Sequence, residues 1–574
     1  MMAAGRAALL CAVLYWVCLR FIFPGYFAPL VPHHSDLYIP VGLLERSWTE
    51  ILTYPRPVAY LALRVMGSFG LEGSIAAVII LVLLGIVLTA VLAARWLDRP
   101  PALVPLAVYI VILLAHPQFY FQHRHDVPAA LSYIFLLLAL GAWLRWLHNG
   151  SRAMMLACLA SMGLLILTKE TYAAAAICLL AGTALLEKRR FHSRWILLLG
   201  VVVAIEVLGL LLNVTRYRHF VAFASGASHP YHPSFNPLSM AATLWFYLGK
   251  LFSPAAVLLL LAALAFTGRD FRKLGFSLLS IAAGLAALLP HLVLPNHLFE
   301  EYAWIAAPLV FLPLLLVEPD RLPFKRSVLA YGSLAGFALL WIFTNHGAYN
   351  TPARQWTIQQ ERTNQGIVAS LDRLQSLDPS ARRVLVAGLR ASYHPWLSSD
   401  FVQHELGRSR EWTVLVPRNG PQRRDPPITL ALPEQVRLDE FDHAVLYNEN
   451  GTLARILDRS GLQQAAGSSP GSVLLPALEP HLDRLRKEPD HFTSLLSAGV
   501  LYLEWGWPER AVPYLERALK ASGGENPYPH FFLGQAAEAL RDYAAARLHY
   551  EQAIAADPPP GNSAFREALA RLPQ

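Results

Sequence analysis

The feature that most constrains this chain is a series of long apolar runs between residues 1 and 345. Several runs approach the roughly 20 residues that cross a lipid bilayer as a helix, and others are shorter. They lie at residues 7–23, 75–94, 102–115, 128–147, 154–167, 172–186, 195–212, 254–266, 275–294, 304–317 and 328–343. Only 15% of the chain is charged, against about 25% in a soluble protein. The sequence therefore predicts an α-helical polytopic membrane protein with about eleven transmembrane helices.

Composition also excludes some partners and sites. The net charge of +8 does not indicate a nucleic acid, because the basic residues occur in small groups between apolar runs. The four cysteines, Cys11, Cys18, Cys158 and Cys178, all lie inside apolar runs. This placement favours neither a disulfide framework nor a thiolate metal site. The first apolar run has no small-residue cleavage site after it, so we expect a retained helix rather than a signal peptide.

Every second short loop is basic, which predicts the orientation of the chain. These loops lie at residues 95–99, 145–152, 188–194, 269–273 and 321–326. By the positive-inside rule they are cytoplasmic, which puts the N-terminus inside and everything after residue 345 outside. Arg46, Arg56, Arg216 and Arg218 are exceptions in longer outer loops. We expect a multi-pass inner (plasma) membrane protein with its C-terminal domains in the periplasm.

The alternate loops carry most of the acidic residues and histidines. They hold His33, His34 and Asp36; His123, His125 and Asp126; Lys169 and Glu170; and Glu300 and Glu301. A surface helix is also expected at residues 44–52, where apolar residues recur at helical spacing. Ionisable residues that converge on one face of a membrane protein usually mark a functional site. The outer face is therefore the predicted position of the site.

This arrangement resembles the GT-C superfamily of membrane glycosyltransferases, in particular its mannosyltransferase and ArnT-like members. Asp36 in the first outer loop and Asp126 after the third run lie where that family has its acidic motifs. Tyr-Pro-Arg-Pro at residues 54–57 is similar to a stretch of O-mannosyltransferases that carry tetratricopeptide repeats, and Leu-Thr-Lys-Glu-Thr at 167–171 to a Thr-Lys-Glu segment of bacterial members. Many relatives have paired acids in the first loop, whereas Leu37 follows Asp36 here. This departure leaves metal dependence open.

The resemblance implies transfer of a sugar from a polyprenyl-phosphate-linked donor to a protein or glycan acceptor, with inversion. In such a reaction a carboxylate takes the proton of the acceptor hydroxyl, and Asp36 is the candidate base. Cations stabilise the departing phosphate, and Arg56 and Lys169 are candidates for that role. Asp126 either orients the acceptor or, with His123, binds a divalent cation such as Mg²⁺ or Mn²⁺. The expected substrate contacts are His34, His125, Glu170 and Glu301.

Each of these residues also has a plainer interpretation. Asp36 and Asp126 fit solvated loop acids, and the histidines fit surface hydrogen-bonding groups, because no fixed ligand spacing joins them. Lys169 and Glu170 fit an interfacial ion pair. Arg56 fits an anchor at the membrane lipid headgroups.

Beyond residue 345 the composition changes, and two further domains are expected. Residues 346–477 read as a small α/β unit, with a helix at 366–374 and strands at 384–386, 413–416 and 444–447, but without a glycine-rich phosphate motif. In residues 478–574 small residues recur at an offset of 35, at Gly499, Ala511 and Ala518 and again at Gly534, Ala546 and Ala553. That period is close to the 34 residues of a tetratricopeptide repeat. Two repeats with flanking helices at 482–487 and 564–572 predict a short solenoid that docks a partner or the acceptor.

Three functions remain open at this point. The first is the polyprenyl-phosphate-sugar-dependent glycosyltransferase. The second is an O-antigen ligase or polymerase-like enzyme, in which Arg216 and Arg218 of the long outer loop would be catalytic. The third is a non-enzymatic envelope scaffold, or a transporter, whose repeats recruit partners; the sequence shows no inverted repeat of the kind found in many transporters.

Overall fold

The computed structural model describes residues 2–18, 48, 56–116, 127–186, 200–204, 207–208, 234–267, 270–294, 302–348, 366–367, 369–370, 373–389, 410–417, 423–425, 428–432, 435–448, 452–467, 474–557 and 563–573. These residues belong to two compact units. The described part of the first unit lies within residues 2–348, and that of the second within residues 366–573. Each unit is taken by itself below.

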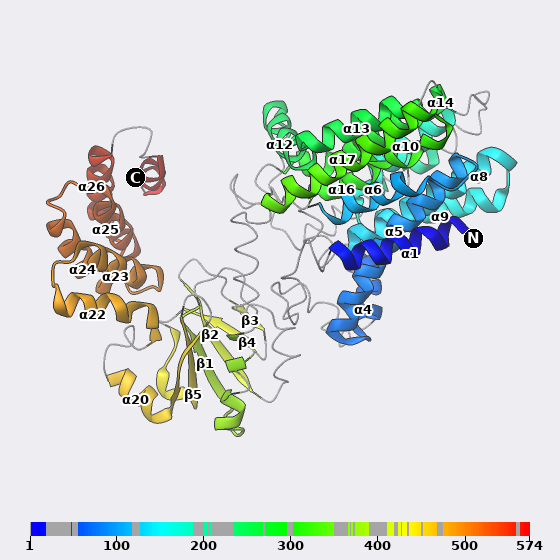
Figure 1. Ribbon diagram of the computed structural model, residues 1–574. Coiled ribbons are helices and arrows are strands. Elements are labelled where there is room, and N and C mark those ends of the chain that lie inside the picture. Colours follow the sequence, from blue (N-terminus) through cyan, green and yellow to red (C-terminus); the bar gives the residue numbers. More distant parts are fainter. Residues whose placement is uncertain are drawn as a thin grey trace. The chain divides into compact units, whose positions relative to one another are not determined.

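The first unit is a bundle of apolar helices (Figure 1). Helix α8 packs against α9 and α5, α14 against α10 and α16, and α17 against α13. The elements are α1 (Met2–Val17), α4 (Pro57–Gly67), α5 (Gly70–Trp96), α6 (Leu103–Leu114), α8 (Val127–Asn149), α9 (Arg152–Thr168), η5 (Glu170–Tyr172), α10 (Ala173–Leu186), α12 (Pro237–Leu251), α13 (Pro254–Phe266), α14 (Phe271–Ala286), α15 (Leu289–Leu292), α16 (Tyr302–Val310), η6 (Leu312–Leu316), η7 (Pro319–Arg321) and α17 (Phe324–Ala348).

Five helical segments of the described part are long and apolar enough to cross a membrane. They are Ala76–Trp96, Val127–Asn149, Phe271–Leu292, Tyr302–Arg321 and Phe324–Thr344, and the pair α12 and α13, bent by 80°, would make a sixth. Helices α1, α6, α9 and α10 are apolar but shorter. Ten of the predicted runs thus coincide with helices, while run 195–212 and surface segment 44–52 lie mostly outside the described residues. The multi-pass character is confirmed, and the count of about eleven stays a prediction.

The outer surface of α17 carries exposed apolar side chains. Val328, Leu329, Leu339 and Phe343 are each more than half exposed, and Phe343 is 76% exposed. A water-facing helix would carry polar residues at these positions. A contiguous apolar face of this kind is expected where side chains meet lipid.

Gly284 allows α14 to approach α16 closely. A Cβ atom at this position would lie 2.6 Å from Val310 Cγ2 and 2.9 Å from the carbonyl oxygen of Ala306. Small residues at such contacts let membrane helices gain dispersion energy along their whole length. The close approach fixes α16 beside α14, and both helices lead to the site described below.

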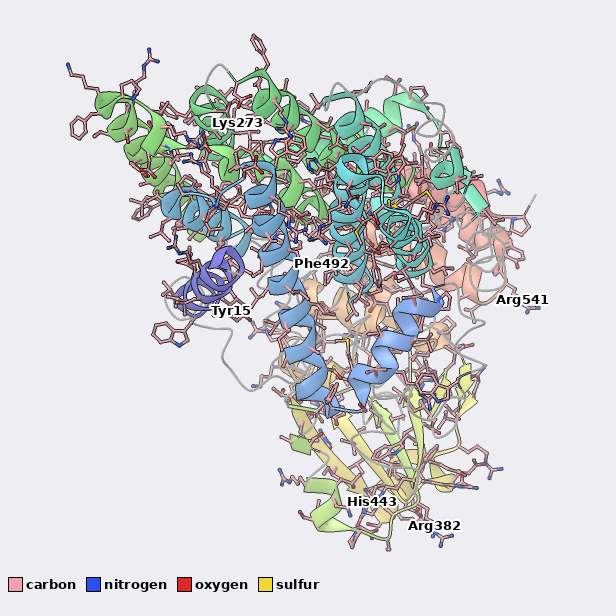
Figure 2. All side chains as sticks on the ribbon, turned by 90° about the vertical axis from the view of Figure 1, so that its right-hand side faces the viewer. Tyr15, Lys273, Arg382, His443, Phe492 and Arg541 are labelled. Atoms are coloured by element: carbon pink, nitrogen blue, oxygen red, sulfur yellow. The ribbon has the colours of Figure 1, made fainter. Side chains whose placement is uncertain are left out.

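A single carboxylate ties three segments together at one end of the bundle. Glu318, which is 8% exposed, accepts hydrogen bonds of 2.5 Å from Arg99 Nε and from Lys273 Nζ. Arg321 lies 3.5 Å from the same carboxylate. Arg99 follows α5, Lys273 is in the first turn of α14, where Figure 2 labels it, and Glu318 precedes η7. We call these four residues the Glu318 junction.

Glu318→Gln is expected to destabilise the protein. The substitution keeps the shape of the side chain but leaves Arg99 without its counter-charge and Lys273 with only Asp270, whose carboxylate lies 3.8 Å from Nζ. We expect a loss of about 2–3 kcal/mol, somewhat below that of a fully buried pair because Arg99 is partly exposed. The measurement is the thermal unfolding midpoint of the protein in detergent. Arg321→Gln is the control and should change the midpoint little, because the Arg321 side chain is 62% exposed. Equal effects of the two substitutions would contradict the stabilising role of the Glu318 carboxylate.

The second unit contains a six-stranded mixed sheet in the order β3-β4-β2-β1-β5-β6. Strands β4, β2, β1 and β5 are parallel, and the edge strands β3 and β6 are antiparallel to their neighbours. The α/β class is confirmed, as are the three predicted strands, which are β1, β2 and β5. The strands are β1 (Arg383–Ala387), β2 (Glu411–Leu415), β3 (Arg423–Asp425), β4 (Ile428–Ala431), β5 (His443–Tyr447) and β6 (Leu453–Asp458).

Asp442 joins the starts of β1 and β5. Its carboxylate accepts hydrogen bonds from the backbone N–H groups of Arg382 and Arg383, at 2.9 and 3.0 Å, and lies 3.2 Å from the Arg459 guanidinium. The Arg383 N–H is the main cause that holds the pKa of Asp442 below its usual value. Figure 2 shows Arg382 and His443 together at this end of the sheet. Asp442 thus lies at the end of the sheet where β1 and β5 begin, and the chain leaves both strands at the opposite end.

The helices after the sheet form the predicted repeats. Buried side chains run without interruption from the sheet, at Leu385 and Leu446, to the repeats, at Leu495 and Leu515, so the two share one core. The boundary drawn between residues 477 and 478 stays a prediction. The elements are η10 (Leu438–Glu440), α20 (Arg459–Gly467), η11 (Pro476–Leu478), α22 (Glu479–Lys487), α23 (Phe492–Glu504), α24 (Pro508–Ala521), α25 (Pro527–Ala539), α26 (Tyr543–Ala556) and α27 (Ser563–Arg571).

The repeated glycines lie where the two helices of each repeat meet. A Cβ atom at Gly499 would lie 2.6 Å from the Leu515 side chain, and one at Gly534 would lie 2.6 Å from the Tyr550 ring. Real Cβ atoms essentially never approach this closely, so a larger residue at either position would force the facing side chain to shift. The interval of 35 residues therefore reports the same helix contact in two successive repeats.

Gly534→Ala is expected to loosen the second repeat. The new methyl group must displace the Tyr550 ring, and overpacking of this kind costs about 1–3 kcal/mol, more than the roughly 1 kcal/mol that alanine gains over glycine in a helix. Hydrogen exchange of α25 and α26 should become faster. Gln535→Ala, at the next residue of α25, adds no volume and should leave exchange unchanged. Unchanged exchange in the Gly534 variant would contradict the packing argument.

Candidate active site

The structure describes only part of the predicted site. Arg56 and Lys169 are described, and Glu170 begins η5, although its side chain is not described. Outside the described residues lie Asp36, Asp126, His34, His123, His125 and Glu301. The meeting of Asp36 and Asp126 in one pocket therefore stays a prediction.

Lys169 ends α9 in a fixed position. Its backbone is extended, with φ −164° and ψ 133°, which terminates the helix. Its N–H donates to the Leu165 carbonyl at 2.9 Å, and its own carbonyl accepts from the Ser132 hydroxyl of α8 at 3.1 Å. The residue is only 6% exposed. An almost buried ammonium group thus lies at the end of α9 that the orientation predicts to be outside.

One aromatic ring lies against this ammonium group, and two further rings continue the contact away from it. Lys169 Nζ lies 5.4 Å from the centroid of the Tyr302 ring, at the start of α16, within the range of a cation–π interaction. The Tyr302 ring stacks on His291 of α15, with centroids 3.9 Å apart and an interplanar angle of 21°. His291 in turn meets the ring of Tyr247 of α12 edge-on at 6.4 Å. We call these four residues the Lys169 cluster.

The segment that follows Lys169 is anchored to α16. The Tyr172 hydroxyl donates to the carbonyl oxygen of Ile305 at 2.8 Å, and its ring lies 5.4 Å from that of Tyr133 in α8. Between the two anchors, the Thr171 hydroxyl is 1% exposed and has no hydrogen-bond partner among the described residues. Buried hydroxyl groups usually have a partner. Thr171 is thus an exception to this rule, directly after Lys169 and Glu170 in the sequence.

Arg56 caps a helix that packs against the same part of the bundle. Its carbonyl accepts from the Tyr60 N–H at 3.1 Å, and Pro57 follows at the first helical position, where proline is favoured. Helix α4 packs against α5, α8 and α9. Lys169 and Arg56 are thus presented by neighbouring elements, and their joint contact with one phosphate stays a prediction.

The cluster provides a preorganised positive charge. An ammonium group loses hydration energy when it is buried, and an anion or a π-face must compensate for it. Such a fixed cation suits the binding of a phosphate. As for metals, no group of three or more histidine, cysteine or acidic side chains within the described residues could hold an ion. The predicted ligands Asp126 and His123 lie outside them, so the divalent cation stays a prediction.

Sequence reasoning missed several members of this site. His291 lies inside the apolar run 275–294, and Tyr247 and Ser132 lie in or beside apolar helices. Placing an ionisable residue within a membrane-spanning run costs free energy, and such residues are usually functional. His291 could therefore have indicated the site from the sequence. The stacking of His291 on Tyr302 was not predictable, because the sequence does not show which helix ends lie side by side.

A family model and solved structures are similar to parts of this chain. The tetratricopeptide repeat family model matches residues 492–524 and 529–560, which confirms the predicted repeats. The fold is similar to that of ArnT from Cupriavidus metallidurans, bound to undecaprenyl phosphate (TM-score 0.45) and in the apo state (TM-score 0.44). Both are 17% identical to this chain, cover 71% and 72% of it, and are themselves covered over 85% and 86% of their length. A search of curated proteins gives no match.

Proposed function

We propose that the protein is a membrane glycosyltransferase that moves a sugar from a polyprenyl-phosphate-linked donor to an extracytoplasmic acceptor. Its N-terminus lies in the cytoplasm and its second unit in the periplasm, as the basic loops predict. The acceptor is a protein or a glycan, and the repeats of the second unit provide the kind of concave surface that docks one.

One observation carries the proposal. The Lys169 ammonium group is almost buried and is held against Tyr302 at the end of α9. A lipid phosphate is the leaving group of the proposed reaction, and it needs cationic stabilisation more than it needs a proton. An interfacial ion pair with Glu170, the plainer interpretation of Lys169, does not by itself account for the contact of the ammonium group with the Tyr302 ring.

The proposed reaction is a single displacement. Asp36 takes the proton of the acceptor hydroxyl as its oxygen bonds to the anomeric carbon. The bond between that carbon and the phosphate oxygen breaks, and the lipid phosphate leaves with both electrons, stabilised by Lys169 and Arg56. Because one bond forms opposite the one that breaks, the anomeric configuration inverts.

The remaining predicted residues complete the proposed site. Asp126 orients the acceptor or, together with His123, holds a divalent cation such as Mg²⁺ or Mn²⁺, which would add positive charge at the phosphate. The other expected contacts to substrate come from His34, His125, Glu170 and Glu301. The alternative ligase or polymerase-like enzyme would instead depend on Arg216 and Arg218, which also lie outside the described residues.

Asp36→Asn is expected to abolish sugar transfer and to leave expression and membrane insertion unchanged, because an amide cannot accept the proton. A strain that lacks the protein should accumulate the lipid-linked sugar donor, which mass spectrometry can identify. That donor is then used in the transfer assay. Asp320→Asn, at an exposed aspartate of η7, is the control and should remain active. If the Asp36 variant still transferred sugar, Asp36 would not be the base.

Lys169→Met is expected to weaken the binding of undecaprenyl phosphate about 10-fold to 100-fold, because a charge-assisted contact to phosphate contributes about 1.5–3 kcal/mol. Native mass spectrometry of the purified protein measures this binding. Lys169→Arg retains the charge and should bind within a few-fold of the unchanged protein. Equal affinities of the methionine variant and the unchanged protein would remove the main support for the proposal.

A further inference from the structure

A cavity of about 740 Å³ lies at the opposite end of α8 and α9 from the Lys169 cluster. It is bounded by the end of α5, the end of α8, the start of α9 and Arg272 of α14. Ser151 and Met154 line it, whereas Lys169 follows the other end of α9. Since α9 has 17 residues, about 25 Å separate the two. This cavity is therefore not part of the proposed active site.

The polar part of the cavity is rich in guanidinium groups. Arg95, Arg145 and Arg272 line it with His148, and Asp98 is its one acidic residue. Neither Arg95 nor Arg145 makes an ion pair with any residue that the structure describes. The cations of the nearby Glu318 junction differ, because Arg99 and Lys273 share the Glu318 carboxylate. Arg95 and Arg145 thus contribute positive charge to the cavity that no described residue pairs with.

The third guanidinium is held in place by an aromatic stack. The Arg272 guanidinium carbon lies 4.7 Å from the centroid of the Trp96 ring. Trp96 is 7% exposed and stacks on Phe276, with centroids 4.2 Å apart. Asp270 accepts from the backbone N–H of Arg272 at 3.0 Å, which fixes the start of α14. A guanidinium stacked on a ring keeps its N–H donors at its edge, where they can bind an anion in a bidentate manner.

Another part of the cavity wall is apolar, while Asn149 and Ser151 add polar groups to the lining. Leu92, Leu144 and Met154 line it, together with Gly141. A Cβ atom at Gly141 would lie only 3.2 Å from Leu92 Cδ2, so a side chain there would crowd this wall. The cavity is large enough for a drug-sized molecule and far larger than a phosphate ion. Its combination of guanidinium groups and an apolar wall matches an amphiphile that carries a phosphate.

We propose that this cavity binds an anionic phospholipid, with Arg95, Arg145 and Arg272 at the phosphate and the apolar wall along the start of an acyl chain. Basic pockets between membrane helices on the cytoplasmic side are suited to such headgroups, and the basic loops predict that this end of the bundle is cytoplasmic. The site is separate from the polyprenyl phosphate site and does not depend on sugar transfer. A soluble phosphate ester would share the phosphate chemistry but not the use of the apolar wall.

The test measures phosphatidylglycerol binding to the purified protein by native mass spectrometry. Arg95→Gln with Arg145→Gln should lower the affinity about 25-fold, at roughly 1 kcal/mol for each arginine. The matched control is Lys325→Gln with Arg326→Gln, which removes two exposed cations at the start of α17 outside the cavity and should bind as the unchanged protein does. Lys169→Met should also keep full phosphatidylglycerol affinity, which separates this site from the active site.

Three outcomes would overturn the proposal. The first is equal loss of phosphatidylglycerol in the cavity variant and the control variant, which would indicate a diffuse effect of charge. The second is binding of phosphatidylcholine as tight as that of phosphatidylglycerol. The third is displacement of phosphatidylglycerol by millimolar inorganic phosphate, which would assign the cavity to a soluble phosphate ester. Thermal unfolding midpoints of both double variants, matched to that of the unchanged protein, show that a loss of binding does not reflect misfolding.

Discussion

The arrangement of the membrane bundle depends on the Glu318 carboxylate. Arg99, Lys273 and Glu318 are far apart in the sequence, yet one carboxylate with both oxygens occupied sets the ends of α5 and α14 and the turn before α17. A charged pair near the membrane surface is strong only if its geometry is fixed, because both groups lose hydration. Glu318 meets this condition, since it is 8% exposed and both oxygens are paired. Apolar packing between membrane helices allows sliding and rotation, so this ionic contact supplies the register that packing lacks.

The register of α14 and α16, set at the Glu318 junction, determines which side chains meet in the Lys169 cluster at the other end of the bundle. Once α14 is fixed by Lys273, the contact at Gly284 places α16 beside it along most of its length. His291 follows α14 and Tyr302 begins α16, so their stacking at 3.9 Å results from that packing. Lys169 reaches the Tyr302 ring from the end of α9, and the Ser132 hydroxyl of α8 donates to the Lys169 carbonyl. The position of a single ammonium group therefore depends on contacts that extend across the thickness of the bundle.

The parts that could be predicted from sequence follow local rules. Apolar runs became helices because a lipid environment requires every backbone polar group to be satisfied within the segment. The interval between Gly499 and Gly534 revealed the repeats because each helix pair needs the same small residue at its contact. Strand β3 was missed because Arg-Arg-Asp has no apolar alternation and pairs only as an edge. The Glu318 junction and the Lys169 cluster were missed because each joins segments that the sequence does not relate, and Asp36 and Asp126 lie outside the described residues.

The basic loops show why a sequence rule for orientation does not assign function. All their arginines and lysines count equally toward the positive-inside rule. Among the described residues, however, some of these cations pair with Glu318 and others line the cavity. Arg272 and Lys273 are adjacent, and because successive helical residues point about 100° apart, one stacks on Trp96 at the cavity while the other binds Glu318. Arg95 and Arg99, at the end of α5, are divided in the same way. A cation that already has a carboxylate partner contributes to stability, whereas Arg95, which lines the cavity and has no ion pair within the described residues, can attract a ligand. The division between these two roles, rather than the number of positive charges, defines what this end of the bundle can bind.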